Sequence, residues 1–170
     1  MEREVIIGID NGCTGTIGVI DSRNEPEFIL TPAFKAQDYT KAKKNVSRID
    51  VPKLYEFLKS RTEGRESLSI AYVERPMINP MRFSSSINAA RAYEATITVL
   101  ETLCIPYQPI DSKEWQRGLL PSSGKKGVEA AVLKQESKDA GIRLFPQFRE
   151  IILKHKDADG ILMAYAKSKS

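Results

Sequence analysis

The chain has 170 residues, 41% of them hydrophobic, enough for one domain whose core needs no disulfide or structural metal. Lys and Arg number 26 against 22 Asp and Glu, so the net charge of +4 gives only weak support for a nucleic-acid partner. No apolar run reaches the roughly 18 residues of a membrane span, and the N-terminus does not resemble a signal peptide. Cys13 and Cys104 form no CxxC pair, which favours a reducing compartment. We therefore expect a single soluble domain over residues 1–170, in the cytoplasm.

Three short strands are predicted first, over residues 5–10, 16–21 and 27–31, as an antiparallel meander. The first is a run of β-branched residues that closes on Asp10. A buried carboxylate is costly unless it is paired or bound to a cation, so Asp10 indicates a metal or phosphate site. The alternative is that Asp10, followed by Asn-Gly, only shapes the turn.

Residues 32–48 are polar and are predicted to form a surface loop. The loop carries five basic side chains: Lys35, Lys41, Lys43, Lys44 and Arg48. Such a loop either contacts phosphates or is simply solvated. Lys43 and Lys44 are the candidate DNA contacts.

A helix over residues 50–60, capped by Asp50, is predicted to cover the sheet. The strand over residues 68–74 follows and ends in a second carboxylate, Glu74, before Arg75-Pro76 stops it. The strongest helical pattern spans residues 86–102, whose face of small residues would pack on the sheet or on a second subunit.

The last third of the chain is predicted to hold one edge strand, three helices and a basic loop. The strand, residues 105–110, contains two prolines, which suits a sheet edge. The short helix at 111–120 contains Trp115. In chain order the remaining elements are the loop 121–127 with Lys125 and Lys126, the helix 128–140 ended by Gly141, and the helix 157–167.

This order predicts an α/β fold with a mixed five-stranded sheet flanked by helices. If the strands that end in Asp10 and Glu74 are parallel neighbours, the two acids lie side by side at the carboxyl edge, where open α/β sheets place their sites. The last helix opens with Asp157 and Asp159. Asp157 taken alone would be read as a helix cap. Three acidic elements together match the carboxylate ligands of two hard cations about 3.5 to 4 Å apart.

With these residues in view, the chain resembles the RuvC family of Holliday junction resolvases, which have an RNase H-like fold. The resemblance rests on Ile-Gly-Ile-Asp10-Asn-Gly, on Tyr-Val-Glu74 and on Asp159-Gly-Ile-Leu-Met-Ala-Tyr-Ala. The chain looks most similar to the phage-type branch of that family, which suggests a phage-encoded protein acting in a bacterial cell. Four features carry that second resemblance: Trp115-Gln116, the basic loop after Pro121, Leu144-Phe-Pro146, and His155 before the last helix.

The resemblance implies that Asp10, Glu74 and Asp159 bind divalent metal, two Mg²⁺ ions per site, with Mn²⁺ as a substitute. The family spaces its last two ligands three or four residues apart, which would select Lys156 or His155. The available carboxylate is Asp157, two residues before Asp159. Residues two apart on a helix point about 200° apart, so Asp157 can join the site only at or before the first turn. We predict Asp157 as the fourth ligand, with His155 as the catalytic alternative.

The resemblance also implies a function: metal-assisted hydrolysis of branched DNA by a homodimer, leaving 5′-phosphates. Lys125 or Lys126 would balance charge on the phosphate and contact DNA, unless the loop is merely mobile and solvated. The helix 86–102 is the candidate dimer helix. Met77 and Phe83 would wedge or stack at the junction, the alternative being that they pack within the protein.

Two other functions share parts of this pattern. Sugar kinases and actin-like ATPases also begin with an Asp followed by a Gly- and Thr-containing hairpin that holds phosphate, but they need two such domains and far more than 170 residues. A non-catalytic protein that binds branched DNA would keep the fold and a degraded site. Cleavage of a synthetic junction, with ATP turnover measured in parallel, separates the three.

Overall fold

The computed structural model describes residues 4–38 and 41–169 and contains a mixed five-stranded sheet. Its strands are, in spatial order, β3 (Glu27–Leu30), β2 (Thr16–Asp21), β1 (Val5–Ile9), β6 (Ser69–Glu74) and β7 (Tyr107–Ile110). β1, β2 and β3 pair antiparallel, whereas β1, β6 and β7 run parallel. The predicted sheet is confirmed, and the proline-containing strand β7 lies at an edge.

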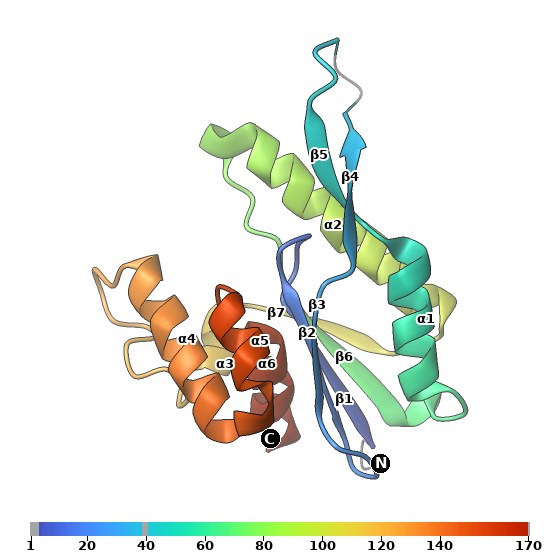
Figure 1. Ribbon diagram of the computed structural model, residues 1–170, viewed down its shortest axis with the longest axis vertical. Helices are drawn as coiled ribbons and strands as arrows, with labels where there is room; N and C mark the ends of the chain where they lie inside the picture. The colour runs from blue at the N-terminus through green and yellow to red at the C-terminus, as the bar shows by residue number, and fades with distance from the viewer. Residues whose placement is uncertain (1–3, 39–40, 170) are drawn as a thin grey trace.

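Helices cover both faces of the sheet (Figure 1). One face carries α1 (Val51–Thr62) and α2 (Phe83–Thr102). The other carries α3 (Ser112–Gln116), α4 (Ala130–Leu144), α5 (Arg149–Lys154) and α6 (Asp159–Ser168). The described chain also contains three short 3-10 turns: η1 (Glu66–Leu68), η2 (Pro80–Arg82) and η3 (Pro146–Phe148). No described helix has the length and apolar character needed to cross a membrane.

Successive side chains along β1 point to opposite faces of the sheet, so its residues contact the two helical layers in alternation. Val5, Ile7 and Ile9 are buried in the cluster that includes α1 and α2. Gly8 faces the other way, toward α6. Asp10 lies two residues after Gly8, so its side chain is on the same face of the sheet, the face that α6 covers.

Helix α6 lies unusually close to the sheet because glycines line the contact. A Cβ on Gly18 would lie 2.2 Å from the Cα of Ile161, and one on Gly8 would lie 2.2 Å from the carbonyl oxygen of Gly160. Neither separation is physically possible, so both strand positions require glycine. The close contact brings the first turn of α6 to the centre of the sheet.

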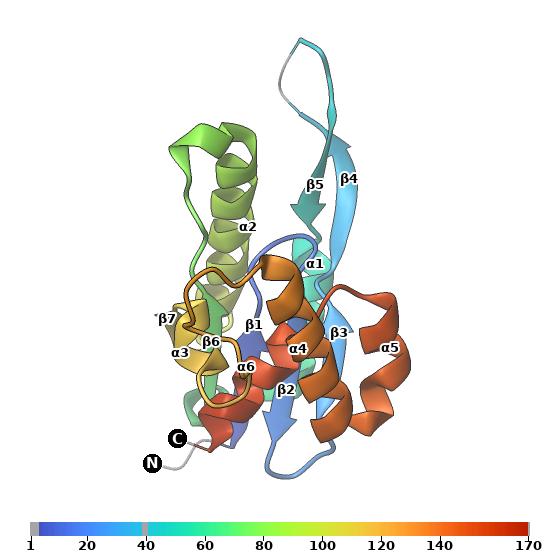
Figure 2. The same ribbon diagram turned by 90° about the vertical axis from the view of Figure 1, so that its left-hand side faces the viewer.

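The prediction of a loop over residues 32–48 is wrong, because this segment contains a β-hairpin. β4 (Ala33–Gln37) and β5 (Asn45–Ile49) pair antiparallel and project away from the main sheet (Figures 1 and 2). Most side chains of both strands are exposed, so the buried/polar alternation that would have revealed a strand is missing. Lys43 and Lys44 lie in the turn of this hairpin, whose residues 39–40 are outside the described part of the chain.

Several helix boundaries also differ from prediction. Helix α2 begins at Phe83 rather than at residue 86. Gly141, predicted to end a helix, lies inside α4, where a Cβ would come 2.4 Å from the Cβ of Ala158. Packing rather than helix termination therefore explains this glycine. Helix α5 was not predicted, and α6 begins at Asp159 rather than at residue 157.

Candidate metal centre

Asp10 and Glu74 are neighbours at the carboxyl edge of the sheet. β1 and β6 run parallel with Ile9 opposite Val73, so the residue that follows each of them lies at the same level. Glu74 shares a face of β6 with Tyr72, which packs against the α6 layer. The structure confirms that the two acidic strands are parallel neighbours.

Asp157 and Asp159 reach the same place from the start of α6. Asp159 is the first residue of the helix and Ala158 is its N-cap, so Asp157 lies before the first turn. The angle of about 200° between side chains two residues apart on a helix therefore does not apply to Asp157 and Asp159. The Gly160 amide donates a hydrogen bond to Thr16 Oγ1 at 3.0 Å, which fixes this turn to β2. Asp157 thus lies before the first turn of the last helix, as it must if it is to join the site with Asp159.

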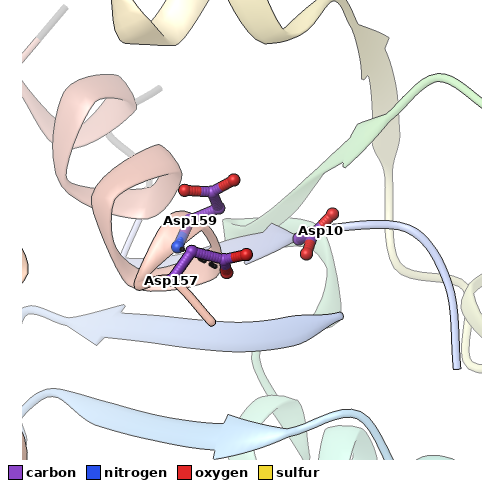
Figure 3. A group of neighbouring side chains, drawn as sticks. All are labelled: Asp10, Asp157 and Asp159. Atoms are coloured by element: carbon purple, nitrogen blue, oxygen red, sulfur yellow. Dashed lines mark hydrogen bonds between the residues drawn. The ribbon is translucent and has the colours of Figure 1, made fainter. Parts of the chain in front are cut away.

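Asp10, Asp157 and Asp159 form a compact group that could hold a metal ion. One carboxylate oxygen from each lies within 4.8 Å of the others. Figure 3 shows the Asp157 side chain directed toward Asp10, with Asp159 beside them. Glu74 is not part of this tightest group, although its carboxylate is close enough for Asp159 and Asp157 to raise its pKa.

Burial and mutual repulsion raise the pKa values of these acids. Burial, with smaller contributions from Glu74 and Asp157, raises the pKa of Asp10 to about 7. Burial and the charge of Asp159 raise the pKa of Glu74 to about 7. The pKa of Asp159 is raised as well, mainly by burial and then by Asp157 and Asp10. A cation bound among these carboxylates would stabilise the site, because it would allow them to be ionised at the same time.

One cation in the cluster is supplied by the protein itself. The Lys156 ammonium lies 3.7 Å from Asp10 Oδ2 and 3.6 Å from Asp157 Oδ2. Burial lowers the pKa of Lys156, but the carboxylates of Asp10, Asp157 and Asp159 outweigh burial and leave it raised. Lys156 is therefore charged at neutral pH.

His155 lies next to this group but is not one of its members. Burial lowers the pKa of its imidazole, and the ring forms a hydrogen bond with the Thr14 backbone in the β1–β2 turn. Its Nε2 atom is buried without a hydrogen-bond partner among the described residues. The geometry thus favours Asp157 over His155 as the additional ligand.

Two neighbours that sequence reasoning did not assign to the site orient its carboxylates. Ser137 on α4 donates from Oγ to Asp159 Oδ1 at 2.5 Å and accepts the Ala158 amide at 3.0 Å. The Trp115 indole donates to Glu74 Oε2 at 3.3 Å. From the sequence, Trp115 was identified only as part of a motif. Ser137 could not be assigned to the site, because the residue pattern of α4 does not show which of its residues contacts the start of α6.

The donor set fits a hard divalent cation. Asp10 is 7% exposed, and its Oδ2 is buried, forms no close hydrogen bond among the described residues, and faces the Lys156 ammonium at 3.7 Å. A buried carboxylate oxygen without a donor is costly. Mg²⁺ and Mn²⁺ favour carboxylate oxygens, and all three members of the group offer them.

The predicted DNA contacts lie on exposed loops around this edge. Lys125 and Lys126 line a surface hollow with Gln116, between α3 and α4. Met77 is 85% exposed and Phe83 is 71% exposed. The alternative that these two residues pack within the protein is therefore wrong for this chain. Figures 1 and 2 show the β4–β5 hairpin and the first turn of α2 projecting in the same direction.

No protein-family model and no curated protein sequence matches the chain significantly. Among solved structures, the chain is similar to Thermus thermophilus RuvC in complex with a Holliday junction substrate, with 15% identity, a TM-score of 0.51, and coverage of 96% of this chain and 92% of that one. A structure of Thermus thermophilus RuvC is also similar, with 16% identity, a TM-score of 0.42, and coverage of 95% and 89%. The first comparison confirms the RuvC-like, RNase H-like fold.

Proposed function

We propose that this chain is a metal-dependent endonuclease that cleaves four-way or other branched DNA. The observation that carries the proposal is the compact, largely buried group of Asp10, Asp157 and Asp159 at the carboxyl edge of a RuvC-like sheet. The structural neighbour bound to a Holliday junction supports the choice of substrate.

Asp10, Asp157 and Asp159, joined by Glu74, would hold Mg²⁺ or Mn²⁺. Bound there, a divalent ion lowers the pKa of a water molecule and stabilises developing negative charge on phosphate oxygens. In the hydrolysis, the water oxygen adds to phosphorus and the bond to the 3′-oxygen breaks. The water loses a proton, the 3′-oxygen gains one, and the products are a 5′-phosphate and a 3′-hydroxyl.

The surrounding residues hold the carboxylates in place for this chemistry. Ser137 fixes one oxygen of Asp159, and Trp115 fixes one oxygen of Glu74, so the other oxygen of each remains to bind a ligand. The hydrogen bond from Gly160 to Thr16 ties the helix that carries Asp159 to the strand beside Asp10. Side chains held by neighbours reach a productive geometry without further ordering.

The DNA path that we propose runs over the basic loops and the exposed apolar segment before α2. Lys43 and Lys44 on the hairpin and Lys125 and Lys126 on the other loop would contact phosphates. The apolar segment is well suited to wedging or stacking at the branch point. The exposed apolar residues of this segment and of the first turns of α2 are Met77, Ile78, Met81, Phe83 and Ile87.

A homodimer with α2 at its interface would present two such sites to the two exchanging strands of a junction. The small residues of α2, among them Ala89 and Ala90, would allow a second helix to approach closely. Sedimentation of the protein with and without junction DNA tests this assembly. A protein that stays monomeric in complex with the junction would contradict it.

The deciding experiment is cleavage of a synthetic four-way junction, with linear duplex as the control substrate. We expect Mg²⁺- or Mn²⁺-dependent nicks that leave 5′-phosphates, lost in Asp10→Asn and retained in Asp139→Asn, an exposed acid on α4. Junction binding without cleavage by the wild type would instead indicate a non-catalytic DNA-binding protein. ATP turnover measured in parallel would reveal a phosphotransferase.

Charge reversal of the two lysine pairs tests the DNA path. Each lost phosphate contact reduces the slope of log affinity against log salt by roughly one. We expect Lys125→Glu with Lys126→Glu to lower binding and also the cleavage rate at saturating protein. Lys43→Glu with Lys44→Glu should lower binding alone. Unchanged salt slopes in both double variants would contradict this path even if the metal site is correct.

A further inference from the structure

The Lys156 side chain is the feature of the acidic centre that the proposed chemistry has not yet used. It follows the short helix α5 and precedes Asp157, and its ammonium is placed between two carboxylates. The distances to Asp10 Oδ2 and Asp157 Oδ2 are 3.7 and 3.6 Å. Both acids belong to the group that could hold a metal ion.

We propose that the Lys156 ammonium is a built-in cation of the active site that takes the place of a second divalent ion, so that one metal ion per chain suffices. This inference rests on the proposed nuclease function and refines its metal requirement. The family resemblance implies two ions, whereas the structure places a fixed positive charge within the same carboxylates.

The charges of the centre support a single divalent ion. Asp10, Glu74, Asp157 and Asp159 supply at most four negative charges, of which a divalent ion and an ammonium would balance three. A second divalent ion beside Lys156 would place five positive charges among four carboxylates before the phosphate arrives. Like charges a few ångströms apart repel strongly in a partly buried site.

The ammonium of Lys156 is positioned by its two ion pairs, and the backbone from which the side chain starts is held beside a buried residue. Its side chain is 37% exposed, while its neighbour Asp157 is 1% exposed and is held at the start of α6. The side chain of Lys156 therefore starts next to a buried residue, and its ammonium pairs with two of the carboxylates that could hold a metal ion.

The test counts Mn²⁺ ions by the electron paramagnetic resonance of free Mn²⁺ during titration of the DNA-free protein. We expect one ion per chain in the wild type and in Lys156→Arg, which keeps the charge. In Lys156→Gln, removal of a positive charge beside the ion should tighten the first Mn²⁺ by about tenfold or allow a second to bind. Lys154→Gln, an exposed lysine at the end of α5, removes the same charge outside the centre and should titrate like the wild type.

Junction cleavage supplies the second measurement. The wild-type rate should rise hyperbolically with Mn²⁺, whereas Lys156→Gln should lose at least tenfold in rate at low Mn²⁺ and show a sigmoidal dependence on Mn²⁺. Lys156→Arg should recover part of the loss. Thermal denaturation of each variant checks that it is folded.

These measurements distinguish failure of the proposed role of Lys156 from failure of the proposed nuclease function. Two Mn²⁺ ions per wild-type chain, or Mn²⁺ affinity and cleavage in Lys156→Gln equal to wild type, would overturn the role of Lys156 and leave the nuclease proposal intact. No Mn²⁺ binding and no cleavage by the wild type would overturn the metal-dependent function itself.

Discussion

Asp10→Asn provides the sharpest test of the acidic centre, because the structure predicts that it makes the metal-free protein more stable while removing metal binding. Burial and neighbouring acids raise the pKa of Asp10 to about 7, from an ordinary value of 3.8. The folded protein thus holds a proton on Asp10 at pH values where the unfolded chain has already lost it. Ionising this carboxyl therefore opposes folding.

The size and the pH range of the effect follow from the two pKa values. A difference of about 3 pKa units corresponds to at most about 4 kcal/mol. We expect a gain of about 2 to 4 kcal/mol for Asp10→Asn in EDTA at pH 8, or very roughly 5 to 15 °C in melting temperature. The gain should be complete above pH 7, shrink as the pH falls from about 7 to about 4, and vanish below that.

Urea and thermal denaturation of both proteins between pH 4 and pH 8 would measure this gain. Repeating the series with Mn²⁺ should reverse the order of stability, because an ion that binds only the folded wild type stabilises it by mass action. A metal-free Asp10→Asn protein that is less stable than wild type at pH 8, together with equal Mn²⁺ stabilisation of both, would refute the reasoning.

Three further substitutions test the supports of the site and an ion pair at the opposite end of the sheet. Ser137→Ala should cost about 2 kcal/mol of stability and weaken Mn²⁺ binding in a titration, because two hydrogen bonds that order Asp159 are lost. Gly18→Ala should cost about 3 kcal/mol or more in urea denaturation, since its methyl would collide with the α6 backbone; a wild-type stability would show that α6 can move away from the sheet. Asp21→Asn should destabilise at pH 8, opposite to Asp10→Asn, because Arg65 holds the pKa of Asp21 well below its usual range; this loss should stay complete down to about pH 4 and shrink only as the pH falls further toward the folded-state pKa.

The acids at the strand ends were predictable from the sequence because two independent signals coincide. A short, mainly apolar run defines each strand, and a turn signal after Asp10 or Glu74 marks where the strand stops. Once both strands are assigned to one parallel pair, the acids must share an edge. Whether Asp157 can join the site depends on the residue at which α6 begins, which the structure shows to be Asp159.

Other features depend on contacts that no local pattern records. The β4–β5 hairpin buries too few side chains to produce an alternating pattern. Gly141 looks like a helix stop but is needed for close packing against Ala158. The ligand spacing of the family that the chain resembles selected Lys156 or His155, without explaining what a lysine would do among carboxylates. That question is answered only by the position of its ammonium between Asp10 and Asp157.

The centre joins residues from opposite ends of the described chain, so its formation depends on how α6 docks on the sheet. Asp10 follows the first strand, whereas Asp157 and Asp159 belong to the start of the last helix. Gly8 and Gly18 let that helix approach, and Thr16 accepts a hydrogen bond from its first turn. Carboxylates crowded by this docking repel one another until a cation joins them. The close packing of α6 therefore produces both the burial and the repulsion of these carboxylates, and a bound metal ion would relieve that repulsion.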